Sequence, residues 1–201
     1  MSALFQRISR RFSAGMTAAP PALWLDPRIQ EIEAFTPAAV LIAITERERP
    51  GLLLLHRPST MRAHPGQIAF PGGRIDPGED PVTAALREAH EELGIDPAQV
   101  RVIGPSDRHR TGSGYEITPV LAVVPPDIDI RPNPTEVAQW FEAPVDFVLD
   151  PANQVTRTIE WEDRQHSFVE IVWHDGRQDH VIWGVTGAIL HNLTKRLNWH
   201  G

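Results

Sequence analysis

The stretch from Gly72 to Ile95 constrains this chain most, because it joins a glycine-rich loop to a short helix with well-defined ends. Asp80 is a suitable N-cap, Pro81 suits the first turn, and Gly94 provides a stop after Leu93. With about 3.6 residues per turn, the side chains of this helix divide into two faces. The face expected to pack on a core consists of Val82, Ala85, Leu86, Ala89 and Leu93.

The other face carries Glu88, Glu91 and Glu92 within an arc of about 100°, and we expect these side chains to face solvent and a metal ion. Like charges three or four residues apart on a helix repel each other, and only Arg87 is placed to offset them. A divalent cation would reverse the sign of this repulsion, and carboxylate oxygens suit Mg²⁺ or Mn²⁺. Judged from the acids alone, a solvated glutamate-rich helix is an equal alternative.

The spacing of the fixed residues favours the metal site. Gly73 is followed after five residues by Glu79, and Glu79 is followed after seven residues by Arg87-Glu88-Ala89-His90-Glu91-Glu92-Leu93-Gly94-Ile95. This pattern resembles the Nudix box, G-x5-E-x7-R-E-U-x-E-E-x-G-U with U apolar, at every fixed position. The resemblance implies an α/β fold, namely a Nudix-like α/β/α sandwich with a mixed β-sheet and a loop–helix–loop catalytic box.

The same resemblance implies a hydrolase that cleaves a nucleoside diphosphate linked to another group, with Mg²⁺ or Mn²⁺ as cofactor. Arg87 would orient a glutamate through a charge-assisted hydrogen bond, and Glu79 would support the site. The base that activates water is left open between Glu88 and Glu136. The implied catalytic residues are Arg87, Glu88, Glu91, Glu92 and Glu136, and the implied metal ligands are Gly73, Glu88, Glu91 and Glu92.

The segment in front of the box, 53–73, indicates the substrate. It resembles the coenzyme A signature of CoA pyrophosphatases, LL-T-x-R-(S/A)-x3-R-x3-G-x3-FPGG, although Leu55 replaces the threonine and Pro58 replaces the small residue. Coenzyme A carries a diphosphate and a 3′-phosphate, which guanidinium groups bind well. We therefore predict that four residues contact the substrate: Arg57, Arg62, Phe70 and Gly72. The alternative for the two arginines is ordinary surface charge.

These resemblances predict a metal-dependent pyrophosphohydrolase that splits coenzyme A or acyl-CoA into 3′,5′-ADP and (acyl) 4′-phosphopantetheine. The alternatives are a Nudix enzyme for another dinucleotide, such as ADP-ribose or NADH, and a non-catalytic module that senses a nucleotide. His90 lies away from both helix faces and is expected to be solvated. His56 and His64 flank the arginine loop, where ordinary histidines are expected rather than phosphate ligands.

The 201 residues suit a single domain, predicted over 24–201. Residues 1–23 contain three arginines and no acid, and we interpret them as a tail, helical or disordered, rather than as a transit peptide. The absence of cysteine excludes disulfides and thiolate catalysis. A net charge of −7 argues against a nucleic-acid partner, and no apolar run is long enough to span a membrane. We expect a cytoplasmic protein with a small-molecule substrate and leave a homodimer open.

Strands dominate the predicted elements, and two further helices follow the acidic one. Pro119 interrupts its strand and favours an edge position or a bulge. Loops are expected at 58–72, 108–114 and 125–134, and Asp175-Gly176 is expected to form the turn in a C-terminal meander. The predicted strands are 38–45, 51–57, 100–104, 116–124, 136–141, 159–161, 167–173 and 180–183, and the predicted helices are 145–149 and 186–197.

Overall fold

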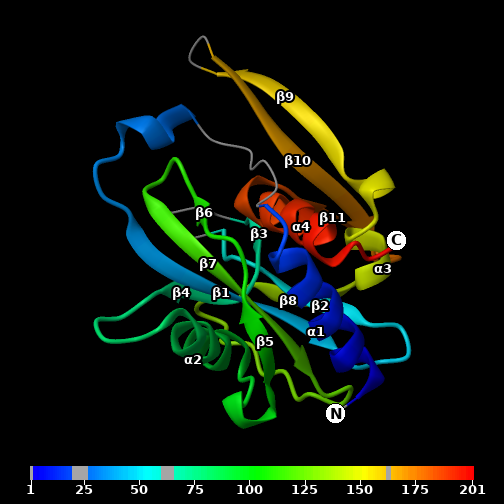
Figure 1. The fold of residues 1–201 in the computed structure, drawn as a ribbon. Coiled ribbons are helices and arrows are strands. Elements are labelled where there is room, and N and C mark those ends of the chain that lie inside the picture. The colour runs from blue at the N-terminus through cyan, green and yellow to red at the C-terminus, as the bar shows by residue number, and fades with distance from the viewer. Residues whose placement is uncertain (1, 20–26, 60–65, 162–163) are drawn as a thin grey trace.

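A mixed β-sheet forms the centre of the computed structural model, which describes residues 2–19, 27–59, 66–161 and 164–201 (Figure 1). The main strand order is β3–β2–β1–β7–β5, while β4 pairs with β1, β6 with β7 and β8 with β2. The pair β1–β7 is parallel, and the other pairs are antiparallel. The strands are β1 (Thr36–Thr45), β2 (Gly51–His56), β3 (Ile68–Ala69), β4 (Gly72–Arg74), β5 (Arg101–Pro105), β6 (His109–Arg110), β7 (Tyr115–Val124) and β8 (Gln139–Pro144).

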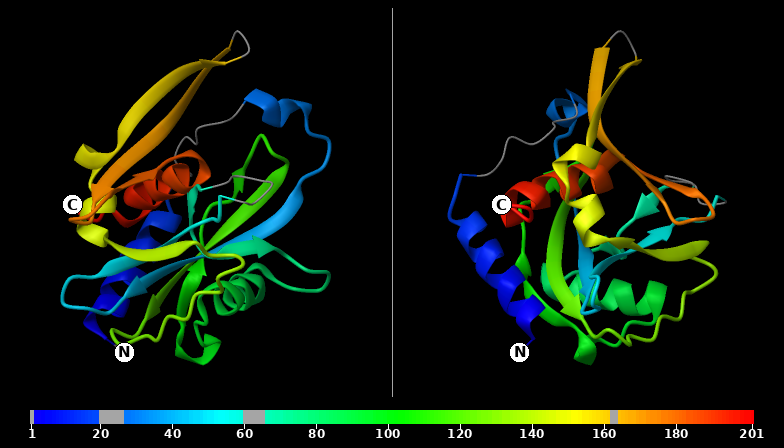
Figure 2. Two further views of the ribbon diagram at one scale, coloured as in Figure 1. Left: turned by 180° about the vertical axis from the view of Figure 1, so that it is seen from behind. Right: turned by 90° about the vertical axis from the view of Figure 1, so that its right-hand side faces the viewer.

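Helices cover both faces of this sheet (Figure 2). The α-helices are α1 (Ala3–Met16), α2 (Pro81–Leu93), α3 (Val145–Val148) and α4 (Gly184–Leu197). Short 3₁₀ helices are η1 (Pro27–Glu31), η2 (Pro97–Gln99) and η3 (Pro151–Asn153). Within the residues that the structure describes, no helix is both long enough and apolar enough to cross a membrane. The prediction of an α/β fold with a mixed sheet between helices is confirmed.

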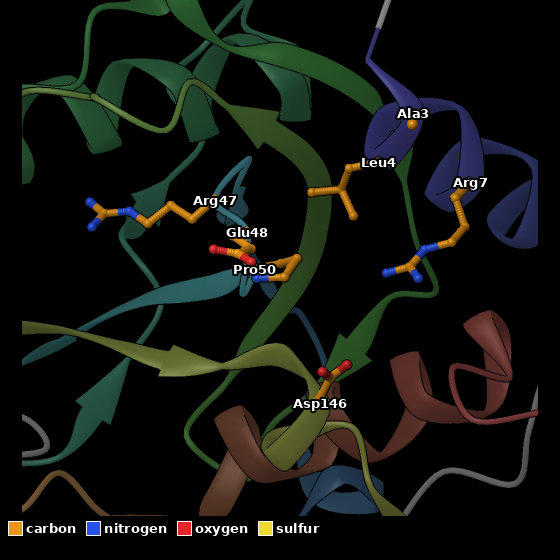
Figure 3. Close-up of a pocket in the computed structure, with 7 residues that line it drawn as sticks. All are labelled: Ala3, Leu4, Arg7, Arg47, Glu48, Pro50 and Asp146. Atoms are coloured by element: carbon orange, nitrogen blue, oxygen red, sulfur yellow. The ribbon is translucent and has the colours of Figure 1, made fainter.

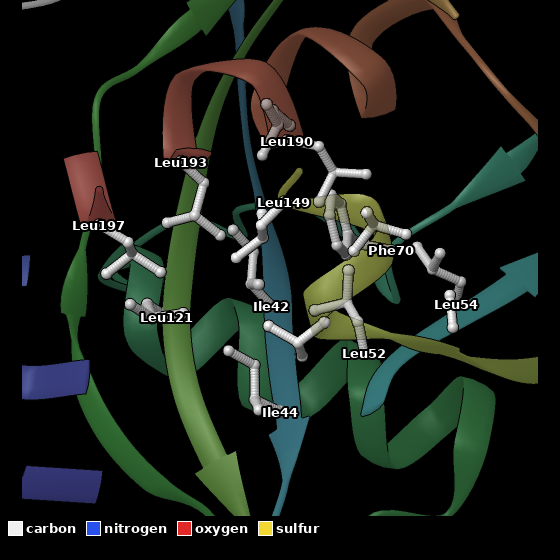
Figure 4. Close-up of a cluster of buried hydrophobic side chains, with 14 of the residues drawn as sticks. Ile42, Ile44, Leu52, Leu54, Phe70, Leu121, Leu149, Leu190, Leu193 and Leu197 are labelled. Atoms are coloured by element: carbon white, nitrogen blue, oxygen red, sulfur yellow. The ribbon is translucent and has the colours of Figure 1, made fainter. Parts of the chain in front are cut away.

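Alternation along the strands divides the core into two layers. Ile42 and Leu54 face one way and belong to the cluster that includes buried residues of α1, α3 and α4 (Figure 4). Leu41 and Leu55 face the other way and belong to the cluster that includes Ala85 and other small residues of α2. Successive residues at the end of β2 therefore point toward different helical layers.

The N-terminal helix α1 is part of the first layer rather than a separate arm. Ile8 is fully buried and Phe12 nearly so, both in the cluster shared with α4. The buried guanidinium of Arg196 in α4 donates to the carbonyl oxygen of Ala18 at 3.0 Å and pairs with Asp107 at 2.7 Å. Helix formation at 3–16 agrees with the helical form of the expected tail, and the domain boundary at residue 24 stays a prediction.

The C-terminal strands β9 (Val155–Trp161), β10 (Arg164–His174) and β11 (Asp179–Ile182) form an antiparallel meander, as predicted. Its inner face buries Val169, Ile171 and Ile182 in the core cluster shared with α4. Strand β11 contacts β3, so the meander lies beside the end of β2. This contact connects the C-terminal strands to the segment that carries Arg57.

Several element predictions need correction. The loop predicted at 58–72 contains β3 and the first residue of β4, and the loop predicted at 108–114 contains β6. Strand β8 begins at Gln139 instead of residue 136, and α4 begins at Gly184 instead of residue 186. Strands of two or three residues are too short to show a hydrophobic period, so only their pairing partners reveal them.

The edge position predicted from Pro119 is wrong. Strand β7 is interior, because β1 pairs with one side of it and β5 and β6 pair with the other. The carbonyl of Pro119 accepts the N–H of Ser106 at 2.8 Å, which lies between β5 and β6. Proline fits here because no ladder N–H is needed at the break between two short strands. The irregularity is in β5, where the register shifts between Val102 and Gly104.

Candidate active site

Helix α2 has the ends that the sequence predicts. The carboxylate of Asp80 accepts the backbone N–H groups of Val82 and Thr83 at 2.8 and 3.1 Å. Gly94 adopts φ 68°, a left-handed conformation that glycine reaches without strain, and ends the helix after Leu93. These caps fix the position of the glutamates on the last two turns.

The glutamates of α2 differ strongly in burial. The side chain of Glu91 is 49% exposed and that of Glu88 is 16% exposed, whereas Glu92 is 6% exposed as a residue. The expectation that Glu92 faces solvent is therefore wrong. Ala84 and Ala85 are fully buried, and such small side chains let the helix approach the sheet closely. Glu92 is consequently drawn against β4, where its carboxylate accepts the Gly72 N–H at 2.9 Å.

Burial raises the pKa of Glu92 to about 8, and repulsion from the Glu88 and Glu136 carboxylates acts in the same direction. The Gly72 hydrogen bond and the positive charge of Arg57 oppose this increase in pKa. These effects place four charged side chains from three segments of the chain within electrostatic reach of one another. Glu88, Glu92, Glu136 and Arg57 thus form one site, although they are far apart in the sequence.

Arg87 connects the glutamates around it. Its Nε donates to Glu79 at 2.9 Å, and its NH1 donates to Glu88 at 2.9 Å and to Glu91 at 3.1 Å. Its NH2 also donates to the carbonyl of Arg74 at 3.0 Å. The hydrogen bonds to Glu79 are the main reason that the pKa of Arg87 is raised, and they fix the guanidinium plane. This geometry matches the orienting role expected for Arg87 and the supporting role expected for Glu79.

The burial of Glu88 raises its pKa, while the guanidinium of Arg87 lowers it. The Glu88 carboxylate lies directly over Gly73, because a Cβ atom built on Gly73 would be 2.4 Å from Glu88 Oε1. Only glycine permits this approach of the carboxylate to β4. Glu88 and Glu92, two of the residues expected as metal ligands, therefore lie against the short strand that begins at Gly72.

The donor chemistry of this site suits a hard divalent cation. Glu88 and Glu92 repel each other, and the carbonyl of Gly73 is a further oxygen donor of the kind Mg²⁺ and Mn²⁺ prefer. Arg87 holds Glu91 on the exposed side of the helix. Within the described residues, no three Asp, Glu, His or Cys side chains form a ready metal-binding cluster. Glu88 and Glu91 accept hydrogen bonds from the same Arg87 nitrogen, and Glu92 is close enough to Glu88 for the two to repel, so Glu88 is the predicted ligand that the other two approach.

Glu136 reaches the site through a backbone contact that sequence reasoning missed. The N–H of Asn133 donates to the Glu92 carbonyl at 2.8 Å, and the N–H of Arg131 donates to the Leu93 carbonyl at 2.7 Å. The last carbonyls of a helix lack partners within the helix, so a passing extended segment can bind them. This segment, 131–136, ends in a turn and places Glu136 beside the acids of α2. The four prolines in 125–134 indicate only that this part of the chain is irregular.

Arg57 follows the last residue of β2 and belongs to the same alternation as Leu53 and Leu55, which face α2. Its charge acts on Glu92, and its Nε atom is buried without a hydrogen-bond partner among the described residues. Such an atom favours an anionic ligand, because an unsatisfied buried donor is costly. Arg62 and His64, also singled out by the sequence, lie outside the described residues.

Two other predicted substrate contacts have different surroundings. Phe70 is 3% exposed and packs in the core cluster on the far side of the sheet (Figure 4), which leaves its backbone rather than its ring for a substrate. Gly72 donates its N–H to Glu92 and pairs with Val40. His90 is exposed, as expected, and its Nδ1 lies 3.1 Å from the carbonyl oxygen of Ile95.

A pocket of about 340 Å³ lies elsewhere, between α1, the β1–β2 turn and α3 (Figure 3). Arg7 lies over the ring of Trp199, and Asp146 accepts a hydrogen bond from the same indole, so both charges already have partners. None of the residues expected at the catalytic site lines this pocket. Its lining residues are Ala3, Leu4, Arg7, Arg47, Glu48, Pro50 and Asp146.

Comparison with known proteins gives a consistent assignment. The sequence profile of the NUDIX domain matches residues 35–165. A curated relative from Enterobacter sp. (strain 638), named "Uncharacterized Nudix hydrolase NudL", is 40% identical over 161 residues, which are 80% of this chain and 82% of the relative. The protein of the same name from Photorhabdus laumondii is 38% identical and covers 80% of this chain and 84% of the relative. The solved structure of the Nudix hydrolase RenU from M. smegmatis has a TM-score of 0.49 at 27% identity and covers 56% of this chain and 73% of that chain.

Proposed function

The chain belongs to the Nudix hydrolase family, whose members act on pyrophosphate bonds, and from this premise we propose that it hydrolyses coenzyme A or an acyl-CoA. Water attacks the diphosphate, and the products are 3′,5′-ADP and the (acyl) 4′-phosphopantetheine. The rival substrates are other nucleoside diphosphate derivatives, such as ADP-ribose and NADH. The match of the segment before the box to the coenzyme A signature is the reason to prefer the first reading.

The observation that carries the proposal is the position of Arg57. Its guanidinium lies in the layer of α2, acts electrostatically on Glu92, and has a buried Nε atom without a partner among the described residues. A phosphate oxygen would satisfy this donor and balance its charge. We therefore assign Arg57 to the 3′-phosphate of a coenzyme A molecule whose diphosphate lies over the acids of α2.

Nudix hydrolases use divalent metal ions, and we assign Mg²⁺ or Mn²⁺ to Glu88, Glu92 and the carbonyl of Gly73. When bound, the cation neutralises negative charge that develops on the diphosphate oxygens. Glu91 accepts a hydrogen bond from the same Arg87 nitrogen as Glu88, so it is close enough to share the cation with Glu88. Arg87 meanwhile keeps the Glu88 carboxylate oriented against β4.

We assign the role of general base to Glu136. It approaches Glu88 and Glu92 from a separate segment, so it can accept a proton from the attacking water while those two residues keep their ligand role. The turn at 134–136 is held by Asn133, whose side-chain oxygen accepts the N–H of Thr135 at 3.1 Å. Glu88, the other candidate, is already bonded to Arg87 and lies against Gly73.

Replacing Arg57 tests the substrate assignment. We expect Arg57→Ala to lower kcat/KM for coenzyme A about 100-fold and that for dephospho-coenzyme A, which lacks the 3′-phosphate, about tenfold or less. The matched control is Arg131→Ala, since the Arg131 side chain is 80% exposed and pairs with Asp129 at the surface. Equal losses for the two substrates would contradict the assignment of Arg57 to the 3′-phosphate. Tight nucleotide binding without any metal-dependent hydrolysis would instead favour a sensor.

A further inference from the structure

Two histidines connect the C-terminal strands to the end of β2. His180 in β11 is fully buried, and its Nε2 lies 3.1 Å from the carboxylate of Asp175 in the preceding turn. Its Nδ1 lies 3.0 Å from Nε2 of His56, the last residue of β2. The backbone of Gly66 lies beside the His56 ring. A continuous polar chain therefore runs from Asp175 through both rings to the base of the loop that precedes β3.

Aromatic rings hold the side chains of the two histidines in place. Phe141 stacks on His180 with ring centroids 3.9 Å apart, and Trp173 stacks on it at 5.2 Å. Phe141 also contacts the His56 ring at 5.3 Å. A buried imidazole is tolerated only when its nitrogens have partners, and here both nitrogens of His180 have them. The arrangement is a built contact between two sheets rather than a chance approach of surface side chains.

The chain has three polar contacts in series, between the Asp175 carboxylate, the two rings and the Gly66 backbone. A carboxylate only accepts hydrogen bonds, so the Nε2 of His180 carries the hydrogen that it donates to Asp175, and the Nδ1 of His180 faces His56. Asp175 therefore has two roles. Its carboxylate contacts His180, and it also accepts the N–H groups of Arg177 and Gln178 within its own turn.

This series of contacts, from Asp175 through the two histidine rings, restrains the position of Arg57. His56 and Arg57 are consecutive, so their side chains point to opposite layers, His56 toward β11 and Arg57 toward α2. The backbone of Arg57 is bonded to the same loop base, since its N–H donates to Gln67 at 3.0 Å and its carbonyl accepts the Gly66 N–H at 3.1 Å. Movement of the His56 ring or of Gly66 therefore moves Arg57.

We propose that His180, supported by Asp175, is a positioning residue that holds His56 and so keeps the Arg57 guanidinium aimed at the substrate phosphate. The inference rests on the proposed function in one respect, namely that Arg57 binds the substrate. It assigns to the C-terminal meander a role in substrate affinity, while the residues on α2 perform the hydrolysis. His180 and Asp175 do not touch the reacting atoms.

The variant His180→Phe keeps the ring stack with Phe141 and Trp173 and removes both nitrogen contacts. We expect KM for coenzyme A to rise about tenfold with kcat changed less than about twofold, the loss typical of one hydrogen bond. His180→Asn places an amide near the former Nδ1 and should restore part of the affinity. The matched control is His174→Phe, because His174 pairs with Asp179 at 2.9 Å on the exposed face of the same hairpin.

A double-mutant cycle decides whether the effect passes through Arg57. If His180 acts by positioning Arg57, His180→Phe changes KM by less than about twofold in an Arg57→Ala background. An undiminished tenfold effect in that background would overturn the proposal. So would a loss in kcat with KM unchanged, since that pattern does not reflect substrate positioning.

Backbone hydrogen exchange gives a readout that needs no substrate. We expect the amides of Arg57 and Gly66 to exchange about tenfold faster in His180→Phe and at the original rate in His174→Phe. Unchanged exchange in His180→Phe would overturn the proposal even if coenzyme A is the substrate. If another diphosphate is hydrolysed instead, the proposed function fails, and the same cycle with that compound still decides the role of His180.

Discussion

Glu92 shows how a single residue can trade stability for function. Its carboxylate is almost completely buried, its pKa is raised mainly by that burial, and it lies near two other carboxylates. Burying such a charge costs free energy that an apolar or neutral residue would not cost. A side chain in these surroundings is explained better by ligand binding than by fold stability.

Replacing Glu92 by glutamine tests this explanation. Glutamine retains an oxygen for the Gly72 N–H and removes an acid whose pKa is raised to about 8 by burial, so we expect Glu92→Gln to raise the free energy of unfolding by about 1 kcal/mol. The rate of hydrolysis should fall at least 100-fold or so, because a metal ligand is lost. Thermal melts and steady-state kinetics measure both effects. Glu91→Gln, at a half-exposed position, should leave the melting temperature nearly unchanged.

His109 makes the fold sensitive to acid. Burial lowers its pKa from 6.5 to about 4, and the nearby Asp107 opposes that shift only in part. As the pH falls below about 6.5, this histidine is protonated in the unfolded chain but stays neutral in the folded chain. The free energy of unfolding therefore decreases between about pH 6.5 and pH 4, by up to about 3 kcal/mol. Melts from pH 7.5 to pH 4 should show a smaller loss for His109→Gln than for the native chain. Equal losses would contradict this role of His109.

The sequence of helix α1 gives little indication of how much this helix contributes to the stability of the fold. The sequence predicts a helical or disordered tail over residues 1–23, and in the helix that forms there Ile8 has no exposed surface. We expect Ile8→Ala to cost about 2–4 kcal/mol of unfolding free energy, measured by chemical denaturation. Arg10→Ala, at an exposed position of the same helix, should cost less than about 0.5 kcal/mol. A negligible cost for Ile8→Ala would show that α1 is dispensable.

The elements that sequence predicted well are those whose signals are local. Helix α2 begins and ends where Asp80 and Gly94 indicated, because caps depend on neighbouring residues only. The short strands β3, β4 and β6 escaped prediction because pairing with distant strands creates them. Pro119 misled for the same reason, since the break between β5 and β6 that accommodates it is not visible in its own strand.

In the candidate site too, the sequence predicts features that depend on neighbouring residues and misses those that depend on contacts between distant segments. The periodicity of α2 placed Glu88 and Glu92 on one side, but it did not reveal that Glu92 is buried, because burial depends on how closely the alanine face approaches the sheet. The approach of Glu136 depends on backbone hydrogen bonds to the end of α2, which no residue pattern announces.

In the whole molecule, the central sheet separates two layers with different tasks. In the layer of α2, small side chains of the helix pack against the sheet, and this layer carries the acids, Arg57 and Glu136. The layer of α1, α3 and α4 holds the other core cluster and meets the C-terminal meander (Figures 1 and 4). The histidine pair at the end of β2 connects the two layers at the substrate arginine. A cytoplasmic location stays a prediction from the sequence, which leaves a homodimer open.

The most direct test of the central claim is product identification by mass spectrometry after incubating the native chain with coenzyme A, acetyl-CoA, ADP-ribose or NADH, with Mg²⁺, with Mn²⁺ or with a chelator. We expect equal amounts of 3′,5′-ADP and 4′-phosphopantetheine from coenzyme A, formed only when a divalent cation is present. Intact coenzyme A alongside cleaved ADP-ribose or NADH would contradict the substrate assignment, and cleavage in the chelator would contradict the metal assignment to Glu88 and Glu92.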